Sequence, residues 1–290
     1  MTQIPMIEFS QVSKRFKKHQ VLTDINLSIH KGEVIGIVGM NGSGKTTLLR
    51  LITGLMYASS GKVTVNGDIV QPGLLGQLPT SVGALIEAPS FLPQYTGLQN
   101  LLMLAGIQEK IDKQTVMQSM ERVGLDPNNK KKVRAYSLGM RQRLGIAQSF
   151  MESPDILLYD EPTNGLDEQG VQMFKELIRD SVKREAAIIL VSHVKEEIEQ
   201  LCDKVYLIEN GTLSVLREQL EKRWAVELSS FQEFEKLYKL SSSVQISSHE
   251  NGNPVGIIQG EWASEEELGD FLRQNEILFT NIEGMHHDHI

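Results

Sequence analysis

The chain has 290 residues, 40% of them hydrophobic and 23% charged, which suits a globular protein with one large α/β domain and a smaller addition. No run approaches the ~18 to 20 apolar residues that a membrane-spanning helix needs, and the first residues do not resemble a signal peptide, so we expect a cytoplasmic protein. The single cysteine, Cys202, excludes an intrachain disulfide, and we expect it to be a small buried side chain.

The net charge of −8 is unevenly distributed along the chain. Residues 217–290 hold 14 acidic and 6 basic residues, whereas residues 1–216 hold 23 of each. This asymmetry predicts a boundary between two domains, over residues 1–216 and 217–290. A neutral first domain also argues against nucleic acid as a partner.

The first strong pattern is a glycine-rich segment between an apolar run and a helix. Residues 34–38, VIGIV, predict a buried parallel strand, and the sequence GMNGSGKTT and a helical apolar pattern follow it. A strand, G-x-x-x-x-G-K-[ST] and a helix in this order are typical of a loop that binds nucleotide phosphates. Glycines let backbone N–H groups form an anion-binding nest, and the helix N-terminus adds partial positive charge. The residues that we expect to bind nucleotide here are Gly39, Asn41, Gly42, Ser43, Gly44, Lys45, Thr46 and Thr47.

Two side chains of this loop and a later acidic pair are expected to carry the chemistry of ATP hydrolysis. Lys45 can reach the β- and γ-phosphates, and the Thr46 hydroxyl can ligate Mg²⁺. Residues 156–159, ILLY, predict another buried strand, which ends in Asp160 and Glu161. A carboxylate at such a strand end provides the second contact to Mg²⁺, and Asp160 fits that position. Glu161 is placed to polarise the attacking water as general base.

A phosphate loop alone would also allow kinases, GTPases or helicases, and the segment Tyr136–Arg143, YSLGMRQR, separates these classes. It resembles the signature sequence of the ABC family, a Ser-x-Gly loop that opens a helix ahead of the acidic strand. Asn164–Asp167 resembles the family's D-loop, and Ser192–His193, after the apolar run AAIILV, resembles its switch histidine. Phe16 matches the aromatic position that stacks on adenine. In family order, these segments cover about residues 7–211.

The resemblance implies a P-loop ATPase domain that works as a pair, with two ATP molecules sandwiched between the two copies or between two related subunits. Ser137 and the backbone of Gly139 would face the γ-phosphate bound by Lys45 of the other protomer. His193 would contact that phosphate from its own protomer, and Asp167 would help to tie the two sites together. The resemblance further implies a separate membrane permease, with this subunit on the inner face of the cell membrane.

One loop departs from the usual family pattern. Residues 82–93, VGALIEAPSFLP, occupy the place of the Q-loop, and Glu87 stands where glutamine is usual. A carboxylate keeps an acceptor for Mg²⁺ or water but loses the amide donor and adds a charge. Gln94, farther along, is the alternative residue for this part. The loop resembles the branch that exports, or confers immunity to, bacitracin and lantibiotic peptides, and a helical subdomain at about residues 90–150 would follow it.

The tail predicts a separate α+β module. Short strands are expected over 225–229, 243–248 and from 254, with helices after Ser230 and Ser264 and a closing strand over 276–282. The order β-α-β-β-α-β is the ferredoxin-like pattern. A regulatory domain, a second dimer contact and a packing appendage all remain open for this module.

Other functions are weighed against the transporter motor. A soluble translation- or chromosome-associated ATPase would need two ATPase domains or a long coiled coil, and a nucleotide kinase would lack the signature at Ser137 and Gly139. Import and export differ in partners that this sequence does not contain. We therefore expect an ABC exporter ATPase, with an importer, a different cargo or a soluble regulatory ATPase as alternatives.

Overall fold

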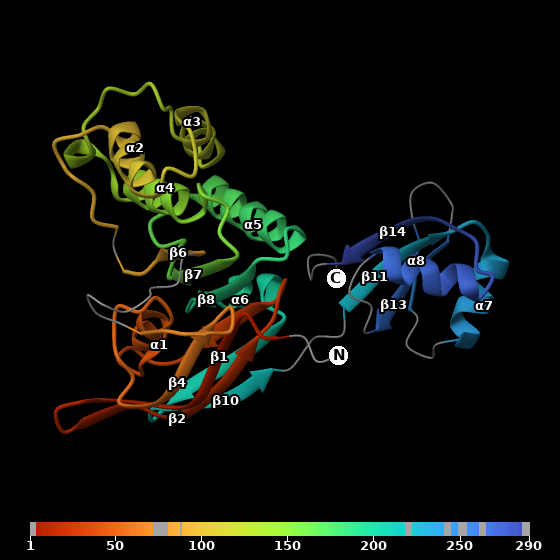
Figure 1. The fold of residues 1–290 in the computed structure, drawn as a ribbon. Coiled ribbons are helices and arrows are strands. Elements are labelled where there is room, and N and C mark those ends of the chain that lie inside the picture. Colours follow the sequence, from red (N-terminus) through yellow and green to blue (C-terminus); the bar gives the residue numbers. More distant parts are fainter. Residues whose placement is uncertain are drawn as a thin grey trace. The chain divides into compact units, whose positions relative to one another are not determined.

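The computed structural model describes residues 4–71, 81–87, 89–217, 222–240, 245–248, 254–260 and 265–285. The chain divides into two compact units, Met1–Glu218 and Gln219–Ile290 (Figure 1). Within the described ranges, no helix combines the length and the apolar character that crossing a bilayer requires.

A six-stranded sheet of order β10-β9-β3-β8-β7-β6 forms the centre of the first unit. The strands from β9 to β6 are parallel to their neighbours, and β10 pairs antiparallel with β9. The apolar runs predicted from the sequence are β3 and β7, and their burial follows from the helices and strands that cover both faces of a parallel sheet. The bounds are β3 Val34–Val38, β6 Val82–Leu85, β7 Ile156–Asp160, β8 Ala187–Val191, β9 Lys204–Glu209 and β10 Thr212–Arg217.

A second, antiparallel sheet of order β2-β1-β4-β5 lies beside the helix that follows the phosphate loop. This helix, α1 (Lys45–Ile52), buries its leucines and Ile52 in one hydrophobic cluster with side chains from both sheets, so it is held between them. Figure 1 shows α1 next to β4 and β1. The bounds of the second sheet are β1 Ile7–Phe16, β2 His19–Ile29, β4 Ser60–Val65 and β5 Asp68–Ile69.

The other face of the central sheet carries the remaining helices of this unit. Helices α2, α3 and α4 share a hydrophobic cluster that includes Leu101, Val116 and Leu144. Thr96 caps α2 in a full capping box with Gln99. The bounds are α2 Gly97–Gln108, α3 Lys113–Arg122, the 3-10 helix Val133–Ala135, α4 Leu138–Phe150, α5 Glu168–Lys183 and α6 Lys195–Leu201. Cys202 is buried, as expected.

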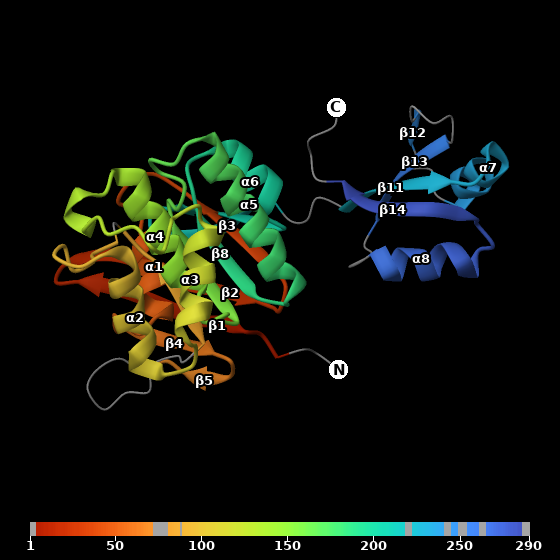
Figure 2. The ribbon, with the colours of Figure 1, turned by 90° about the horizontal axis from the view of Figure 1, so that it is seen from above.

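The second unit is a four-stranded antiparallel sheet with two helices (Figure 2). The strand order is β12-β13-β11-β14, which confirms the ferredoxin-like pattern. Trp224, Val226 and Leu228 alternate along β11 and pack with Leu237 of α7 and Leu272 of α8, so both helices cover one face. The bounds are β11 Lys222–Leu228, α7 Phe231–Leu240, β12 Gln245–Ser248, β13 Pro254–Gly260, α8 Glu265–Gln274 and β14 Phe279–Met285. The predicted cap at Ser264 lies outside the described residues.

The closing strand begins later than the predicted 276–282. Glu276 has a left-handed φ of 55°, and the N–H of Ile277 donates to Leu272 O at 3.0 Å. With the bond from Glu276 N to Arg273 O, this is a Schellman end of α8. The apolar Ile277 therefore belongs to the helix cap and the core, and the ladder of β14 starts only at Phe279.

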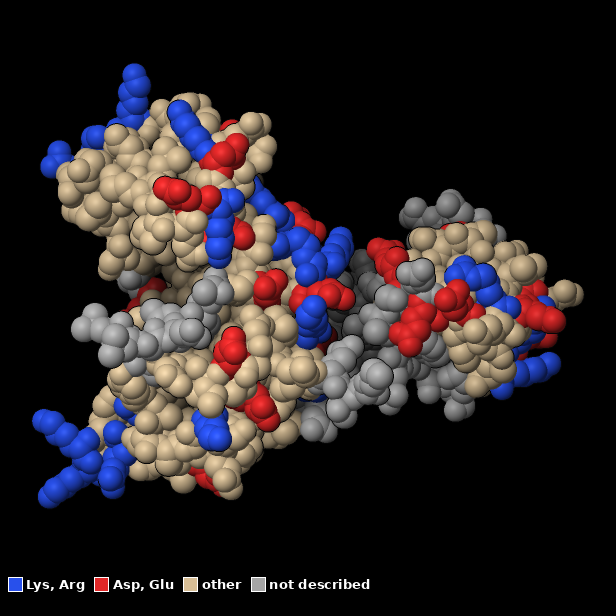
Figure 3. Space-filling model, viewed as in Figure 1, with Lys and Arg blue, Asp and Glu red and all other residues tan. Residues whose placement is uncertain are grey.

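Charges are mixed on the first unit. On the face that Figure 3 shows, acidic and basic side chains lie close to each other in the middle of this unit, whereas basic side chains alone project at its upper and lower-left ends.

Candidate active site

The strand order brings four loops of the first unit to one edge of the central sheet. Ile37 and Asp160 both pair with Val191 of β8, and Leu85 pairs with Tyr159 of β7. Because these strands are parallel, the segments that leave β3, β6, β7 and β8 emerge at the same edge. Ligands of open α/β sheets bind at this position.

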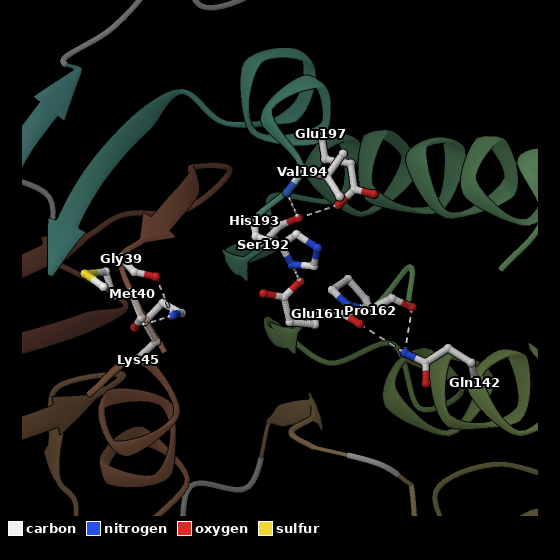
Figure 4. A network of polar contacts seen from close by, with 10 residues as sticks. All are labelled: Gly39, Met40, Lys45, Gln142, Glu161, Pro162, Ser192, His193, Val194 and Glu197. Carbon is white, nitrogen blue, oxygen red and sulfur yellow. Dashed lines mark hydrogen bonds and ion pairs between the residues drawn. The ribbon is translucent and has the colours of Figure 1, made fainter. Parts of the chain in front are cut away.

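The phosphate loop has the shape that its glycines predict. Gly39, Gly42 and Gly44 have φ values of 154°, 82° and 113°. A β-carbon on Gly39 would lie 2.5 Å from Ile208 O, so this position admits no side chain. Lys45 Nζ donates to Gly39 O at 2.7 Å and to Met40 O at 3.0 Å (Figure 4). Among the described residues, the buried Ser43 Oγ has no hydrogen-bond partner, which leaves a polar atom for a phosphate.

Thr46 and Asp160 meet although they lie 114 residues apart in the chain. Thr46 Oγ1, in the first turn of α1, donates to Asp160 Oδ2 at 2.6 Å. A hydroxyl and a carboxylate side by side suit Mg²⁺, which takes one or two protein oxygens together with phosphate and water. The described residues contain no group of three or more His, Cys, Asp or Glu side chains that could hold a metal ion.

Glu161 and His193 form the second pair at this edge. Glu161 Oε2 and His193 Nδ1 lie 2.6 Å apart (Figure 4). The backbone of Glu161 is left-handed, with φ 50°, and its N–H donates to Val191 O of β8. A glutamate in this conformation is strained, and such strain is concentrated at functional sites. The side chain of Glu161 is 25% exposed and that of His193 is 68% exposed, so water can reach both.

Two buried polar side chains support this pair, and sequence reasoning missed both. Gln142 of α4 donates through Nε2 to Pro162 O at 2.7 Å, and Ser192 Oγ donates to Glu197 Oε2 at 2.8 Å. The first bond ties the turn after Glu161 to the signature helix, and the second fixes the turn that carries His193 (Figure 4). The sequence signal for Gln142 is a polar residue on the buried face of a predicted helix, and that for Ser192 is a polar residue directly after a buried strand.

The signature segment caps its own helix and packs against the D-loop. Ser137 is the N-cap of α4 and accepts from Met140 N at 3.2 Å. A β-carbon on Gly139 would lie 2.7 Å from Gly165 O, so the two loops touch through backbone. Ser137 remains exposed, and Gly139 is half-buried.

Arg143 links this segment to two other elements. Its Nη2 lies 2.5 Å from Asp167 Oδ1, and its Nη1 donates to Val123 O at 2.7 Å. The guanidinium hydrogen bond holds the pKa of the Asp167 carboxyl below its usual range, with a further bond from Gly170 N. A β-carbon on Gly124 or Gly170 would collide with the guanidinium, so Arg143 lies in a slot between two glycines.

The remaining predicted residues lie in separate places. Phe16 is 44% exposed at the end of β1, with Lys14 Nζ 4.8 Å from its ring centroid. Glu87 contacts Arg50 of α1, with Oε1 2.5 Å from Nη2. Gln94, the alternative to Glu87, is exposed. The structure thus pairs Thr46 with Asp160 and Glu161 with His193, whereas Glu87 is paired with a residue that sequence reasoning missed.

Comparison with known proteins finds relatives that are ATP-binding proteins of transporters. The ABC transporter family pattern matches residues 22–164. An uncharacterized ABC transporter ATP-binding protein of Bacillus subtilis, YybJ, is 41% identical over 75% of this chain and 99% of its own length. The bacitracin transport ATP-binding protein BcrA of Bacillus licheniformis is 35% identical over 72% of this chain and 68% of its own. The lantibiotic transport ATP-binding protein SrtF of Streptococcus pyogenes is 33% identical over 73% and 91%. These relatives confirm the resemblance to the bacitracin and lantibiotic branch.

Solved structures confirm the fold of the first unit. A dimeric ATP-binding cassette in a post-hydrolysis state, bound to ADP and Pi, superposes with a TM-score of 0.65 at 21% identity. The match covers 73% of this chain and 99% of that chain. Members of this family act as paired cassettes together with separate membrane permease subunits. The chain therefore belongs to the ABC transporter family as an ATP-binding subunit, an ATPase that works on ATP with Mg²⁺.

Proposed function

We propose that this subunit hydrolyses ATP as one half of a homodimer, bound to a separate permease that exports an antimicrobial peptide or another toxic compound. The observation that carries the proposal is the juxtaposition of two pairs, Thr46 with Asp160 and Glu161 with His193, at the sheet edge where the phosphate loop begins. The first pair suits metal binding, and the second pair suits activation of the attacking water.

Within one protomer, the phosphate loop binds the triphosphate through backbone N–H groups, and Lys45 exchanges its loop carbonyls for the γ-phosphate. Thr46 and Asp160 hold Mg²⁺, which offsets the negative charge of the phosphates when bound. The carboxylate of Glu161 accepts a proton from the attacking water. His193 fixes that carboxylate through Nδ1 and presents its remaining ring nitrogen to the γ-phosphate.

Across the pair, the exposed Ser137 and the backbone of Gly139 complete the partner's phosphate site from the N-terminus of α4. Arg143 of this helix contacts Asp167, so the D-loop moves together with the helix. Phe16, which is exposed at the end of β1, stacks on adenine. Two identical copies meet by a twofold axis, because each provides one signature and one phosphate loop.

The relatives support the proposed cargo and location. Bacitracin and lantibiotic transport ATP-binding proteins match at 33–36% identity, and the Q-loop position holds Glu87, the resemblance to that branch noted in the sequence. The subunit would then lie on the inner face of the cell membrane through its permease. An importer or a soluble regulatory ATPase remains the alternative function.

The test is resistance. The chain is expressed together with a candidate membrane permease in a bacitracin- and lantibiotic-sensitive strain, and the inhibitory concentration of each peptide is measured. We expect resistance to rise with the wild-type pair and to return to the sensitive level with Glu161→Gln. Equal sensitivity of all strains to both peptides, despite ATPase activity of the purified complex, would rule out this cargo class. If the purified complex loses its ATPase activity in the phosphate-loop variant Lys45→Ala, the assignment of the chain as an ATPase stands, whatever the result for the cargo.

A further inference from the structure

Glu87 has a fixed partner on the helix that follows the phosphate loop. Its Oε1 lies 2.5 Å from Nη2 of Arg50. Arg50 is in the last turn of α1, four residues after Thr46. Four residues of α-helix advance about 6 Å along the axis, so this ion pair lies one turn beyond the expected Mg²⁺ ligand. It connects the loop after β6 with the helix that holds the metal.

The backbone at Glu87 needs support from its surroundings. Its φ of 64° is left-handed, a conformation in which the β-carbon of any residue but glycine is crowded. The side chains of Arg50 and Glu87 are 35% and 59% exposed. An ion pair as exposed as this contributes little to folding stability, because solvent screens it. Its geometric effect is more specific, since a guanidinium fixes a carboxylate by direction as well as by charge.

We propose that Arg50 is a positioning residue for ATP hydrolysis. It binds Oε1 of Glu87 and thereby directs Oε2 towards the metal and its water. This inference rests on the proposed ATPase function and on the expectation from the sequence that Glu87 provides an acceptor oxygen for Mg²⁺ or its water. A carboxylate without a nearby cation would be repelled by the γ-phosphate. Arg50 balances that charge from the far side of the carboxylate, so that Glu87 can stay beside the phosphates.

A second ion pair of the same kind provides a matched control. Glu185, in the turn before β8, also has a left-handed φ of 62° and lies 3.7 Å from Lys31 Nζ. This turn enters β8 at its amino end, whereas the candidate site lies at the carboxyl ends of the strands. Lys31→Ala therefore removes the cation from a left-handed glutamate without touching the candidate site.

The first test measures kcat and KM for MgATP on the full-length chain. The variants are Arg50→Ala, Arg50→Lys, Glu87→Ala, the double variant Arg50→Ala with Glu87→Ala, and Lys31→Ala. We expect Arg50→Ala and Glu87→Ala each to lower kcat about fivefold to tenfold, with KM within about twofold, because the inferred partner of Arg50 is Glu87 rather than the nucleotide. The double variant should be no slower than Glu87→Ala. Arg50→Lys, which keeps the charge but loses the planar guanidinium, should recover only part of kcat, and Lys31→Ala should match the wild type.

The second test reads position rather than activity. Hydrogen exchange is followed in nucleotide-free protein, in peptides that contain residues 82–87. We expect Arg50→Ala and Glu87→Ala to accelerate exchange there to the same extent, Arg50→Lys to accelerate it less, and Lys31→Ala to leave it unchanged. Equal exchange in the wild type and Arg50→Ala would overturn the inference.

The kinetic outcomes separate the two proposals. If Arg50→Ala slowed turnover equally with and without Glu87, Arg50 would act independently and the inference would fail. If only Glu87→Ala slowed turnover, the inference would fail while the proposed role of Glu87 stood. Full turnover of Glu87→Ala would remove the role of Glu87, and the positioning role of Arg50 with it.

Discussion

Two glutamates, one in each unit, show how the same side chain serves different ends. Glu161 follows a parallel strand with a left-handed backbone, and its carboxylate meets the exposed ring of His193. Glu233 of α7 is only 7% exposed, and its two oxygens accept from Leu278 N and Lys236 Nζ, each at 2.9 Å. These fold contacts, first the backbone bond from Leu278 and then Lys236, hold the pKa of Glu233 below its usual value of 4.5.

The difference follows from the architecture around each glutamate. A parallel sheet gathers the carboxyl ends of its strands at one edge, so loops from distant parts of the first unit meet there. In the second unit, neighbouring strands run in opposite directions, so their carboxyl ends do not meet at one edge. The described connections of this unit are helix caps and turns instead. Water can reach the carboxylate of Glu161, whereas both carboxylate oxygens of Glu233 accept hydrogen bonds within the fold.

Replacement of the proposed base should have the largest effect. Glu161→Gln removes the proton acceptor but keeps the shape of the side chain, so we expect kcat to fall about 10²- to 10⁴-fold. MgATP binding should persist and should hold the two protomers together, as measured by size-exclusion chromatography with light scattering. The control is Glu168→Gln, an exposed glutamate in the first turn of α5. Turnover of Glu161→Gln within tenfold of the wild type would show that another group accepts the proton.

The phosphate loop should be the next most sensitive feature. In Gly39→Ala the added β-carbon would lie 2.5 Å from Ile208 O, so the loop must shift away from the nucleotide. We expect MgATP affinity to fall at least about tenfold in a fluorescence titration, since a shifted nest loses its hydrogen bonds to phosphate. Gly67→Ala is the matched control, because Gly67 has a φ of 85° but nothing within 4 Å of the new β-carbon. Equal losses for both variants would mean that backbone strain, rather than the collision, decides the effect.

The link between Arg143 and Asp167 should have an intermediate effect. Asp167→Asn keeps the cap on Gly170 N but loses the charge partner of Arg143, so we expect weaker pairing of protomers and hydrolysis about threefold to tenfold slower. Asp112→Asn is the control, because Asp112 caps α3 through Thr115 N. The folded-state pKa of Asp167 is depressed, so its contribution is present above the unfolded value and is lost only as acid pH falls through the folded value. A fall in pairing between pH 8 and 6 that disappears in Asp167→Asn would contradict this assignment.

The second unit should show the smallest effect on hydrolysis. Glu233→Gln weakens the contacts to Leu278 N and Lys236, so the thermal transition of this unit should move down while kcat stays within about twofold. Because the pKa of Glu233 is lowered on folding, its contribution is present above pH 4.5 and is lost as pH falls further. Differential scanning calorimetry from pH 7 to 3 tests this, with the exposed Glu235→Gln as control. A loss of hydrolysis in Glu233→Gln would show that the second unit acts on the site.

The sequence by itself determined the local elements and the residue types of the site. The runs over Val34–Val38 and Ile156–Asp160 could be predicted as strands because burial on both faces requires a continuous apolar pattern. The glycines, lysine and threonine of the phosphate loop could be predicted because few other residues allow its backbone and its charge. The order of elements in the second unit was also predictable, because its periodicity changes between strands and helices.

Only the tertiary structure decided which of these residues meet. Thr46 reaches Asp160 across 114 residues, and Arg50 reaches Glu87. Both contacts form because the parallel sheet brings the carboxyl ends of β3, β6 and β7 to the same side. Gln142 becomes a support for Glu161 only when the signature helix packs on the turn after β7. Ile277, which continues an apolar pattern, ends a helix because its N–H closes the Schellman turn. Periodicity reports which face of an element is buried, whereas contacts between loops depend on strand order, which a single sequence does not encode in any local pattern.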